Sequence, residues 1–197
     1  MPPQTFIFFG RSGSGKGTQA RFLIDYLKEK DPARIALYLE TGQQIREFSK
    51  EEGYTSTLIQ SILGKGELLP SFLPIWMWTD FLVKRFTGEE HLIFDGLSRR
   101  LHEASVLDSA IRFYGQTRSH VILINVSRDW AFQHLKSRGR EDDTDDDINR
   151  RLNWYESDVE KALSFFKEKP EYKFIDINGE QTIEKVHQDI VTSLHFQ

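Results

Sequence analysis

A glycine-rich segment at residues 10–18 constrains the fold of this chain more than any other feature of the sequence. It follows a short apolar run at residues 6–9 and precedes residues 19–27, whose apolar side chains have the spacing of one buried helix face. A strand, a tight turn and a helix in this order direct several backbone N–H groups into one concavity at the positive end of the helix. This geometry suits a polyphosphate, with Lys16 reaching the β- and γ-phosphates and Thr18 offering a hydroxyl to phosphate or to hydrated Mg²⁺. A glycine-rich turn without a ligand is the alternative interpretation.

Four further apolar runs are short and are bounded by polar or turn residues. They occupy residues 35–39, 91–94, 121–126 and 172–177, and segments with helical spacing separate them. Strands that alternate with helices indicate a parallel sheet covered on both faces. We therefore expect an α/β fold with five parallel strands. We also expect one domain over residues 1–197, because no repeat, low-complexity tract or proline-rich linker divides the chain.

The composition excludes several classes of function. A net charge of −4 argues against a nucleic-acid-binding protein that works by broad charge neutralisation. The absence of cysteine excludes disulfides, thiolate zinc sites and cysteine nucleophiles, and it fits a reducing compartment. No apolar run approaches the roughly 20 residues that span a bilayer, and a strand that starts by about Thr5 leaves no room for a signal peptide. We therefore expect a cytoplasmic monomer that binds neither nucleic acid nor membranes.

The residues around the lysine narrow the class of phosphate-binding loop. Gly17 follows Lys16 directly and Thr18 comes one place later, whereas the general P-loop has Ser or Thr directly after the lysine. The string from Gly10 to Gln19 resembles the adenylate kinase and UMP–CMP kinase family. The resemblance continues from about residue 5 to residue 194, with the elements in the family's order and spacing.

This resemblance implies a P-loop nucleoside triphosphate hydrolase-like fold with two additions. These are a small insertion at about residues 41–70 that binds the nucleoside monophosphate, and a short lid near residues 135–147. The implied reaction is the reversible, Mg²⁺-dependent transfer of the γ-phosphoryl group of ATP to a nucleoside monophosphate, AMP being the first choice. GMP, CMP or UMP as the acceptor, a nucleotide-binding module without catalytic activity, and a P-loop kinase for a non-nucleotide small molecule are the alternatives.

On the donor side, the resemblance implies an ATP site and water-mediated Mg²⁺ contacts. Asp95 follows an apolar strand, where a carboxylate beside the phosphate loop can hold water on Mg²⁺ together with Thr18, although an aspartate that merely starts a turn is the alternative. His134 stands where the family has an arginine that stacks on the adenine of ATP. The residues implied to contact ATP are Gly13, Ser14, Gly15, Lys16, Gly17, Thr18, His134, Arg138 and Gln181.

On the acceptor side, residues 41–46 resemble the family's Thr-Gly-Asp-x-x-Arg, with Gln43 in place of the aspartate. From the residues alone, Thr41 is equally a helix N-cap and Arg46 a surface side chain. Residues 95–99 resemble Asp-Gly-Phe-Pro-Arg and keep the arginine, whose planar fork can grip a phosphate through two bonds. The residues implied to bind the monophosphate are Thr41, Gly42, Arg46, Glu67, Leu69, Gly96, Arg99, Glu103, Arg140 and Arg151.

Glu103 raises the question of which base the acceptor carries. It lies eight residues past Asp95, where the family usually has a glutamine that reads the edge of adenine. An ionised glutamate only accepts hydrogen bonds, so it suits the donors of guanine or cytosine better than N1 of adenine. The alternative is a slipped alignment, with Glu103 on a solvated helix face.

Arginines near residues 138–151 complete the implied catalytic set. From the residues alone they fit an ordinary solvated helix with salt bridges, and the acidic run at residues 141–147 fits a capped helix start. The resemblance implies instead that these arginines neutralise charge on the transferring phosphoryl group. The residues implied to act in catalysis are Lys16, Asp95, Arg99, Arg140 and Arg151.

Overall fold

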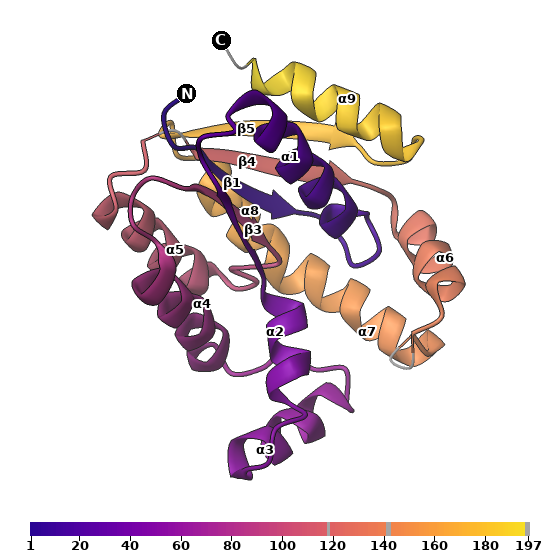
Figure 1. The fold of residues 1–197 in the computed structure, drawn as a ribbon. Helices are drawn as coiled ribbons and strands as arrows, with labels where there is room; N and C mark the ends of the chain where they lie inside the picture. The colour runs from indigo at the N-terminus through magenta and orange to yellow at the C-terminus, as the bar shows by residue number, and fades with distance from the viewer. Residues whose placement is uncertain (118, 141–142, 196–197) are drawn as a thin grey trace.

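The computed structural model describes residues 1–117, 119–140 and 143–195. Its centre is a five-stranded, all-parallel sheet with the strand order β2-β3-β1-β4-β5 (Figure 1). The strands are β1 (Thr5–Phe9), β2 (Ala36–Glu40), β3 (His91–Asp95), β4 (Ser119–Asn125) and β5 (Tyr172–Asn178). The structure thus confirms the predicted α/β fold, and each predicted strand lies within two residues of an observed one at both ends.

Helices cover both faces of the sheet (Figure 1). Helices α1 (Lys16–Lys30) and α9 (Ile183–Leu194) lie on one face, and α4 (Phe72–Arg85), α5 (Leu101–Phe113) and α8 (Glu160–Lys167) lie on the other. The remaining helical elements are α2 (Thr41–Phe48), α3 (Tyr54–Leu63), α6 (Arg128–Arg138), α7 (Asp145–Trp154) and the π-helical turn η1 (Tyr155–Val159) that joins α7 to α8.

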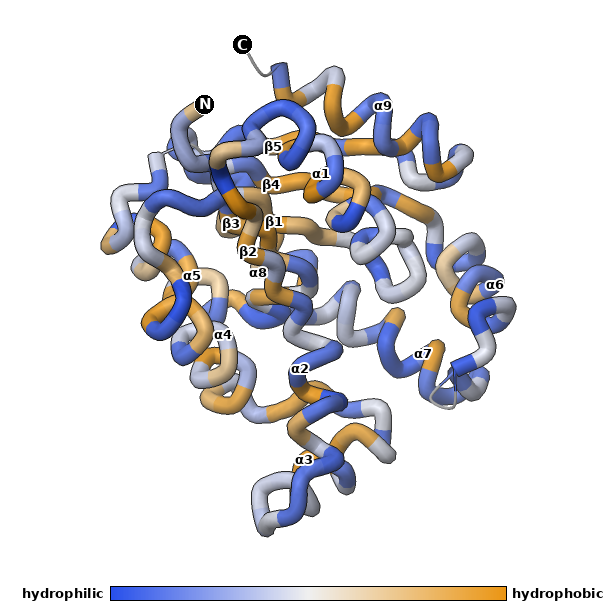
Figure 2. The backbone as a smooth tube through the Cα atoms, viewed as in Figure 1, coloured by the Kyte–Doolittle hydropathy of each residue, from blue (hydrophilic) through white to orange (hydrophobic). Residues whose placement is uncertain are grey.

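The core follows from the alternation of side chains along the strands. Ile7 and Phe9 of β1 pack under α4, α5 and α8, whereas Phe6 and Phe8 pack against α1 and α9. Both faces are buried, so the central strands are apolar at successive positions, as the hydropathy colouring in Figure 2 shows. Charged side chains are therefore confined to the ends of these strands.

Two pairs of helices extend away from the carboxyl-end edge of the sheet (Figure 1). Helices α2 and α3 share a small apolar cluster with the start of α4, formed by Ile45, Ile59, Leu69, Leu73 and Met77. Helices α6 and α7 share another, formed by Val126, Ala131, Leu135, Ile148 and Leu152. Each pair thus has a local core of its own beside the main one.

Some local expectations hold and one is wrong. Thr144 caps α7 and residues 145–147 fill its first turn, which confirms a capped helix start in this acidic run, although residues 141 and 142 lie outside the described residues. Thr41 is not the N-cap of α2: Glu40 occupies that position, and the buried Thr41 hydroxyl has no hydrogen-bond partner in the described part of the chain.

No helix in the described ranges is long and apolar enough to cross a membrane.

Candidate active site

The glycine-rich loop joins the end of β1 to the start of α1, as the sequence predicts. Gly15 is the N-cap of α1 in a left-handed conformation, with φ of 89°. Gly13 has φ of 83°, and a Cβ atom there would lie 2.8 Å from Cγ of Leu135 in α6. Glycine is therefore required at both positions, for backbone conformation at the first and also for close approach at the second.

Lys16, the first residue of α1, folds back over this loop. Its Nζ donates hydrogen bonds to the carbonyl oxygens of Gly10 and Arg11, at 2.9 Å each. Burial lowers the pKa of Lys16, and the negative charge of Asp95 raises it in part. The ammonium group therefore lies within the loop, close enough to Asp95 for the two charges to interact.

Asp95 is buried at the carboxyl end of β3. Burial raises its pKa, which the charge of Lys16 opposes. The hydroxyl of Tyr38 lies 3.3 Å from Oδ2 of Asp95 and 3.2 Å from Oε2 of Glu40, so it bridges the ends of two neighbouring strands. A Cβ atom on Gly17 would lie 3.3 Å from the same Asp95 oxygen, which gives a physical reason for glycine directly after the lysine.

These groups fit a hydrated Mg²⁺ ion. Thr18 and Asp95 both line the cleft described below, and they offer the hard oxygen donors that Mg²⁺ prefers. Within the described ranges there is no group of three or more His, Cys, Asp or Glu side chains that could hold a metal ion. The donor set therefore suits an ion that keeps most of its water and is shared with a phosphate.

Arg46 and Arg99 come together on either side of Gly42. A Cβ atom on Gly42 would lie 3.3 Å from Nη1 of Arg46 and 3.4 Å from Nη2 of Arg99. Arg46 pairs with Glu40 at 3.3 Å, while Arg99 donates from Nε to the Gly96 carbonyl and stacks 5.3 Å above the ring of Trp154. Burial lowers the pKa of Arg99, and Glu103 and Asp95 oppose that shift. The guanidinium groups of Arg46 and Arg99 thus both lie next to the same side of Gly42.

The arginines near the end of α6 and in α7 are held by Asp143. Arg138 donates to this carboxylate at 2.8 and 3.0 Å, Arg151 donates to it at 2.6 Å, and the backbone N–H of Arg140 donates at 3.2 Å. Burial alone would raise the pKa of Asp143, but the hydrogen bonds from Arg138 and Arg151 outweigh it and lower the pKa to about 2. Asp143 therefore stays ionised throughout the physiological range.

The lysine and arginines described above and Asp95 line one open cleft of about 1290 Å³. Among the described residues that line it, nine are Lys or Arg and six are Asp or Glu. The cleft is thus net positive although the whole chain carries −4, so it favours an anionic ligand. The predicted site residues that line it are Gly13, Gly15, Lys16, Gly17, Thr18, Thr41, Gly42, Arg46, Glu67, Leu69, Asp95, Gly96, Arg99, Glu103, His134, Arg138, Arg140 and Arg151.

Two predicted residues lie outside the lining. Ser14 is a buried residue of the loop itself, and its backbone N–H donates to the Arg11 carbonyl at 3.0 Å. Gln181 donates from its side-chain amide to the Asn178 carbonyl and to Asp189, at 2.8 and 3.1 Å. The structure thus places the Gln181 amide in the turn after β5.

Glu103 is buried, so its placement on a solvated helix face is wrong. It is the third residue of α5, and only 2% of it is exposed. Its carboxylate accepts hydrogen bonds from the backbone N–H groups of Arg99 and Arg100 and from the hydroxyl of Ser71. Glu103 thus lines the cleft with its oxygens already engaged by protein donors.

Sequence reasoning missed several residues that shape the cleft. Tyr38 and Trp154 contact charged groups named above. The ring of Trp130 stacks on His134 at a centroid distance of 4.3 Å and an angle of 11°. The spacing of these two rings by four residues in a helix was an available signal, since such residues are neighbours on one helix face. No local sequence pattern predicts the contact of Tyr38 with Asp95 or that of Trp154 with Arg99.

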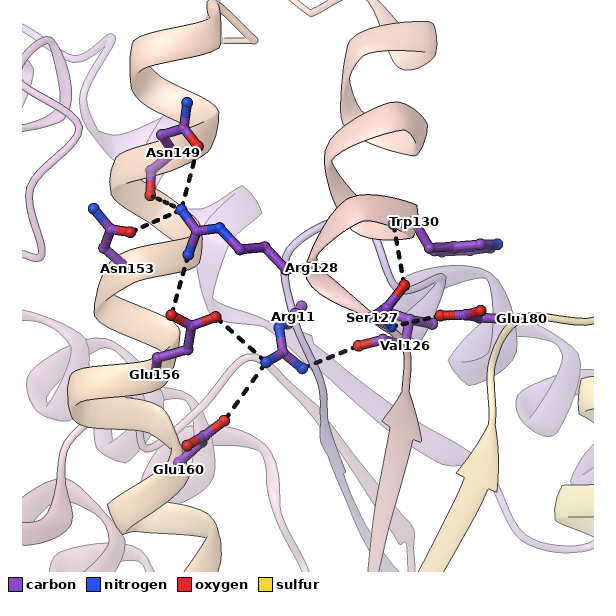
Figure 3. A network of polar contacts seen from close by, with 10 residues as sticks. All are labelled: Arg11, Val126, Ser127, Arg128, Trp130, Asn149, Asn153, Glu156, Glu160 and Glu180. Atoms are coloured by element: carbon purple, nitrogen blue, oxygen red, sulfur yellow. Dashed lines mark hydrogen bonds and ion pairs between the residues drawn. The ribbon is translucent and has the colours of Figure 1, made fainter.

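A polar network fixes the glycine-rich loop to the elements around it (Figure 3). Arg11 lies 3.4 Å from Glu156 and 3.7 Å from Glu160, and it donates to the Val126 carbonyl at the end of β4. The other oxygen of Glu156 accepts a bond from Arg128 at the start of α6. Arg128 also binds Asn149 and Asn153 of α7. Glu156 thus connects the loop to both helices on that side of the cleft.

Comparisons with known proteins agree with this geometry. The family model described as adenylate kinase matches residues 8–171. The chain is 30% identical over 188 residues to adenylate kinase 1 of Nostoc sp., covering 95% of this chain and 97% of that protein. It is 31% identical to the adenylate kinase of Flavobacterium psychrophilum, with 91% and 92% covered, and 28% identical to that of Thermus thermophilus, with 97% of each covered. The similarity therefore extends over nearly the whole chain.

Proposed function

The chain belongs to the adenylate kinase family and is a nucleoside monophosphate kinase, and we propose that it moves the γ-phosphoryl group of Mg·ATP reversibly to AMP. The main support for this proposal is that Lys16, Arg46 and Arg99 all line one net positive cleft. The first of these residues belongs to the phosphate loop, and the other two meet at Gly42. The cleft thus has two separate groups of cationic side chains, one for a donor phosphate and one for an acceptor phosphate.

On the donor side, the backbone of residues 13–18 and the Lys16 ammonium bind the phosphates of ATP. Thr18 and Asp95 would hold a Mg²⁺ ion through water, and the ion would supply positive charge next to the phosphates of ATP. His134 faces the donor base, supported by the stacked ring of Trp130. Gln181 remains part of the proposed donor site, through the turn after β5 in which it lies.

On the acceptor side, residues 41–70 form the insertion that binds the monophosphate. Arg46 and Arg99 hold its phosphate, and Thr41 and Leu69 lie beside its base. Residues 135–147 form the short lid, whose Arg138 and Arg140 close over the phosphates. Arg151 of α7 acts with them, so that charge on the transferring group is neutralised and water is excluded.

The proposed mechanism needs neither a covalent intermediate nor a general base. Phosphoryl transfer passes through a loose transition state whose charge is spread over the equatorial oxygens, so positioning and electrostatic stabilisation supply most of the catalysis. The fixed guanidinium groups of Arg99 and Arg151 provide this stabilisation with little reorganisation. We further propose that the protein acts as a monomer in the cytoplasm. The cysteine-free sequence fits the reducing conditions of that compartment.

A coupled assay of ADP formation tests this function. The enzyme is supplied with Mg·ATP and, in turn, with AMP, GMP, CMP or UMP at equal concentrations. We expect the highest kcat/KM with AMP. A higher kcat/KM with another monophosphate would identify that nucleotide as the preferred acceptor. No turnover with any of the four would contradict the kinase assignment for this chain.

A further inference from the structure

The carboxylate of Glu103 is surrounded by hydrogen-bond donors from its own chain. Oε2 accepts from the backbone N–H of Arg99 at 2.7 Å and from that of Arg100 at 3.2 Å, and Oε1 accepts from the Ser71 hydroxyl at 2.5 Å. The guanidinium of Arg100 also lies 3.8 Å from Oε1. Protein donors thus occupy three of the roughly four acceptor sites of this carboxylate, which leaves it little capacity for the edge of a base.

The two backbone N–H groups belong to the entry into α5. The first N–H groups of a helix have no partner within it, and a carboxylate in the first turn can accept from them while it faces the positive end of the helix. Ser98, just before Arg99, adopts a left-handed conformation with φ of 57°, which is uncommon for a residue other than glycine. The chain therefore turns sharply at Ser98, and the Glu103 carboxylate accepts a hydrogen bond from the backbone of Arg99, the next residue.

The hydrogen bond from the Arg99 backbone to Glu103 fixes the point of the backbone from which the Arg99 side chain extends. Its guanidinium is then fixed by the bond from Nε to the Gly96 carbonyl and by the ring of Trp154. Glu103 is also the strongest negative influence on Arg99, since its charge raises the pKa that burial lowers. Glu103 thus fixes the backbone of Arg99 and balances the charge of its guanidinium.

The same carboxylate also fixes the end of the segment at residues 41–70. Ser71 directly follows that segment, and it is bonded to Glu103. Arg100 donates to the Leu69 carbonyl at 2.6 Å and to the Ser71 hydroxyl at 3.3 Å. Glu103 therefore links the start of α4 to the loop that carries Arg99.

We propose that Glu103 is a positioning residue for Arg99 and does not read the acceptor base. This inference rests on the proposed function, in which Arg99 binds the acceptor phosphate. It replaces the interpretation of Glu103 as a residue that selects guanine or cytosine. Loss of the carboxylate weakens binding of the acceptor phosphate, whatever base is attached to the sugar.

Ribose 5-phosphate, an acceptor analogue without a base, separates the two roles. We expect Glu103→Ala to raise KM for AMP and Ki for ribose 5-phosphate by the same factor, about tenfold or more. The ratios of kcat/KM among AMP, GMP and CMP should stay within about threefold of wild type. Glu103→Gln keeps one oxygen for the backbone N–H groups, so it should leave those ratios unchanged and shift each KM by less than Glu103→Ala.

A double-mutant cycle tests whether the effect passes through Arg99. In an Arg99→Ala background, Glu103→Ala should add less than about twofold to Ki for ribose 5-phosphate. Glu184→Ala, which removes an exposed glutamate from the first turn of α9, is the matched control and should leave KM and Ki unchanged. Glu103→Asp, whose carboxylate is one methylene shorter, replaces Glu103→Ala if that variant does not fold.

Three outcomes would overturn the proposal. The first is a change of tenfold or more in the AMP to GMP or AMP to CMP ratio in Glu103→Gln, which would show base reading. The second is an unchanged Ki for ribose 5-phosphate in Glu103→Ala. The third is an unchanged Ki in Arg99→Ala, which removes the premise that Arg99 binds the acceptor phosphate. Failure of the proposed function would differ from all three, because wild-type enzyme would then phosphorylate no monophosphate.

Discussion

Arg151 of α7 donates a hydrogen bond across 2.6 Å to the carboxylate of Asp143, which lies just before the start of α7. The same carboxylate accepts from Arg138 of α6, so one buried acid joins the two helices on this side of the cleft. The folded-state pKa of this acid, about 2, lies below its unfolded value of about 3.9. Asp143 therefore stabilises the folded state fully above about pH 4, and this contribution is lost as the pH falls towards 2.

Asp143→Asn tests this pH dependence. At pH 7 we expect the substitution to lower the free energy of unfolding by about 1–3 kcal/mol, because it removes a charged acceptor from two arginines. The difference between wild type and variant should shrink as the pH is lowered from 4 to 2.5 in urea unfolding experiments. A difference that stays constant down to pH 2.5 would contradict the ion pairs as the source of this stability.

Arg99→Ala and Arg151→Ala should each lower kcat/KM by at least about a hundredfold, because each removes a proposed charge-assisted contact to the transition state. The thermal unfolding temperature should change little in Arg99→Ala, whose proposed main partner is the substrate. It should fall in Arg151→Ala, which also removes a hydrogen-bond partner of Asp143. Arg85→Ala, at the exposed end of α4, is the control and should retain wild-type activity. Activity within a few-fold of wild type in both active-site variants would show that these arginines do not act as proposed.

Gly17→Ser introduces the residue type that general P-loops have after the lysine. Its Cβ atom would lie 3.3 Å from Oδ2 of Asp95, so the carboxylate would have to shift. We expect kcat/KM to fall about tenfold or more, because small displacements of catalytic groups are costly. Gly17→Ala adds only the Cβ atom and should show most of the same loss. Wild-type kinetics in both variants would mean that Asp95 adjusts without consequence.

Trp130→Leu removes the ring that stacks on His134. We expect KM for ATP to rise about three- to tenfold, because an aromatic pair contributes about 0.5–1.5 kcal/mol. KM for AMP should not change, since both rings lie in α6. Phe113→Leu at the exposed end of α5 controls for general loss of aromatic surface. Equal rises in both KM values would show that the effect is not specific for the donor base.

The fold and the positions of many cleft residues could be predicted from the sequence because their signals are local. The apolar runs mark the strands, and the glycine-rich segment places Lys16 and Thr18 at the start of a helix. Parallel strands then bring Asp95 to the same edge of the sheet as Lys16, since their carboxyl ends meet there. These residues follow from the order of elements along the chain.

The partners of the charged side chains could not be predicted in this way. Glu103 binds Ser71, 32 residues away, and Tyr38 lies beside Asp95, 57 residues away. Such contacts depend on how the elements pack, and no spacing along the sequence encodes them. For Glu103, the sequence indicated a free carboxylate facing a base, whereas the observed donors belong to the protein backbone and to a serine.

Phosphorus NMR of a mixture of ATP, AMP and Mg²⁺ distinguishes phosphoryl transfer from hydrolysis. With wild-type enzyme, we expect ADP signals to appear as ATP and AMP are consumed in equal amounts, with little inorganic phosphate. Lys16→Ala should remain folded and form no ADP, because it lacks the ammonium that we propose to hold the donor phosphates. ADP formed together with an equal amount of inorganic phosphate, at unchanged AMP, would instead indicate hydrolysis of ATP. That result, or normal turnover by Lys16→Ala, would contradict the account.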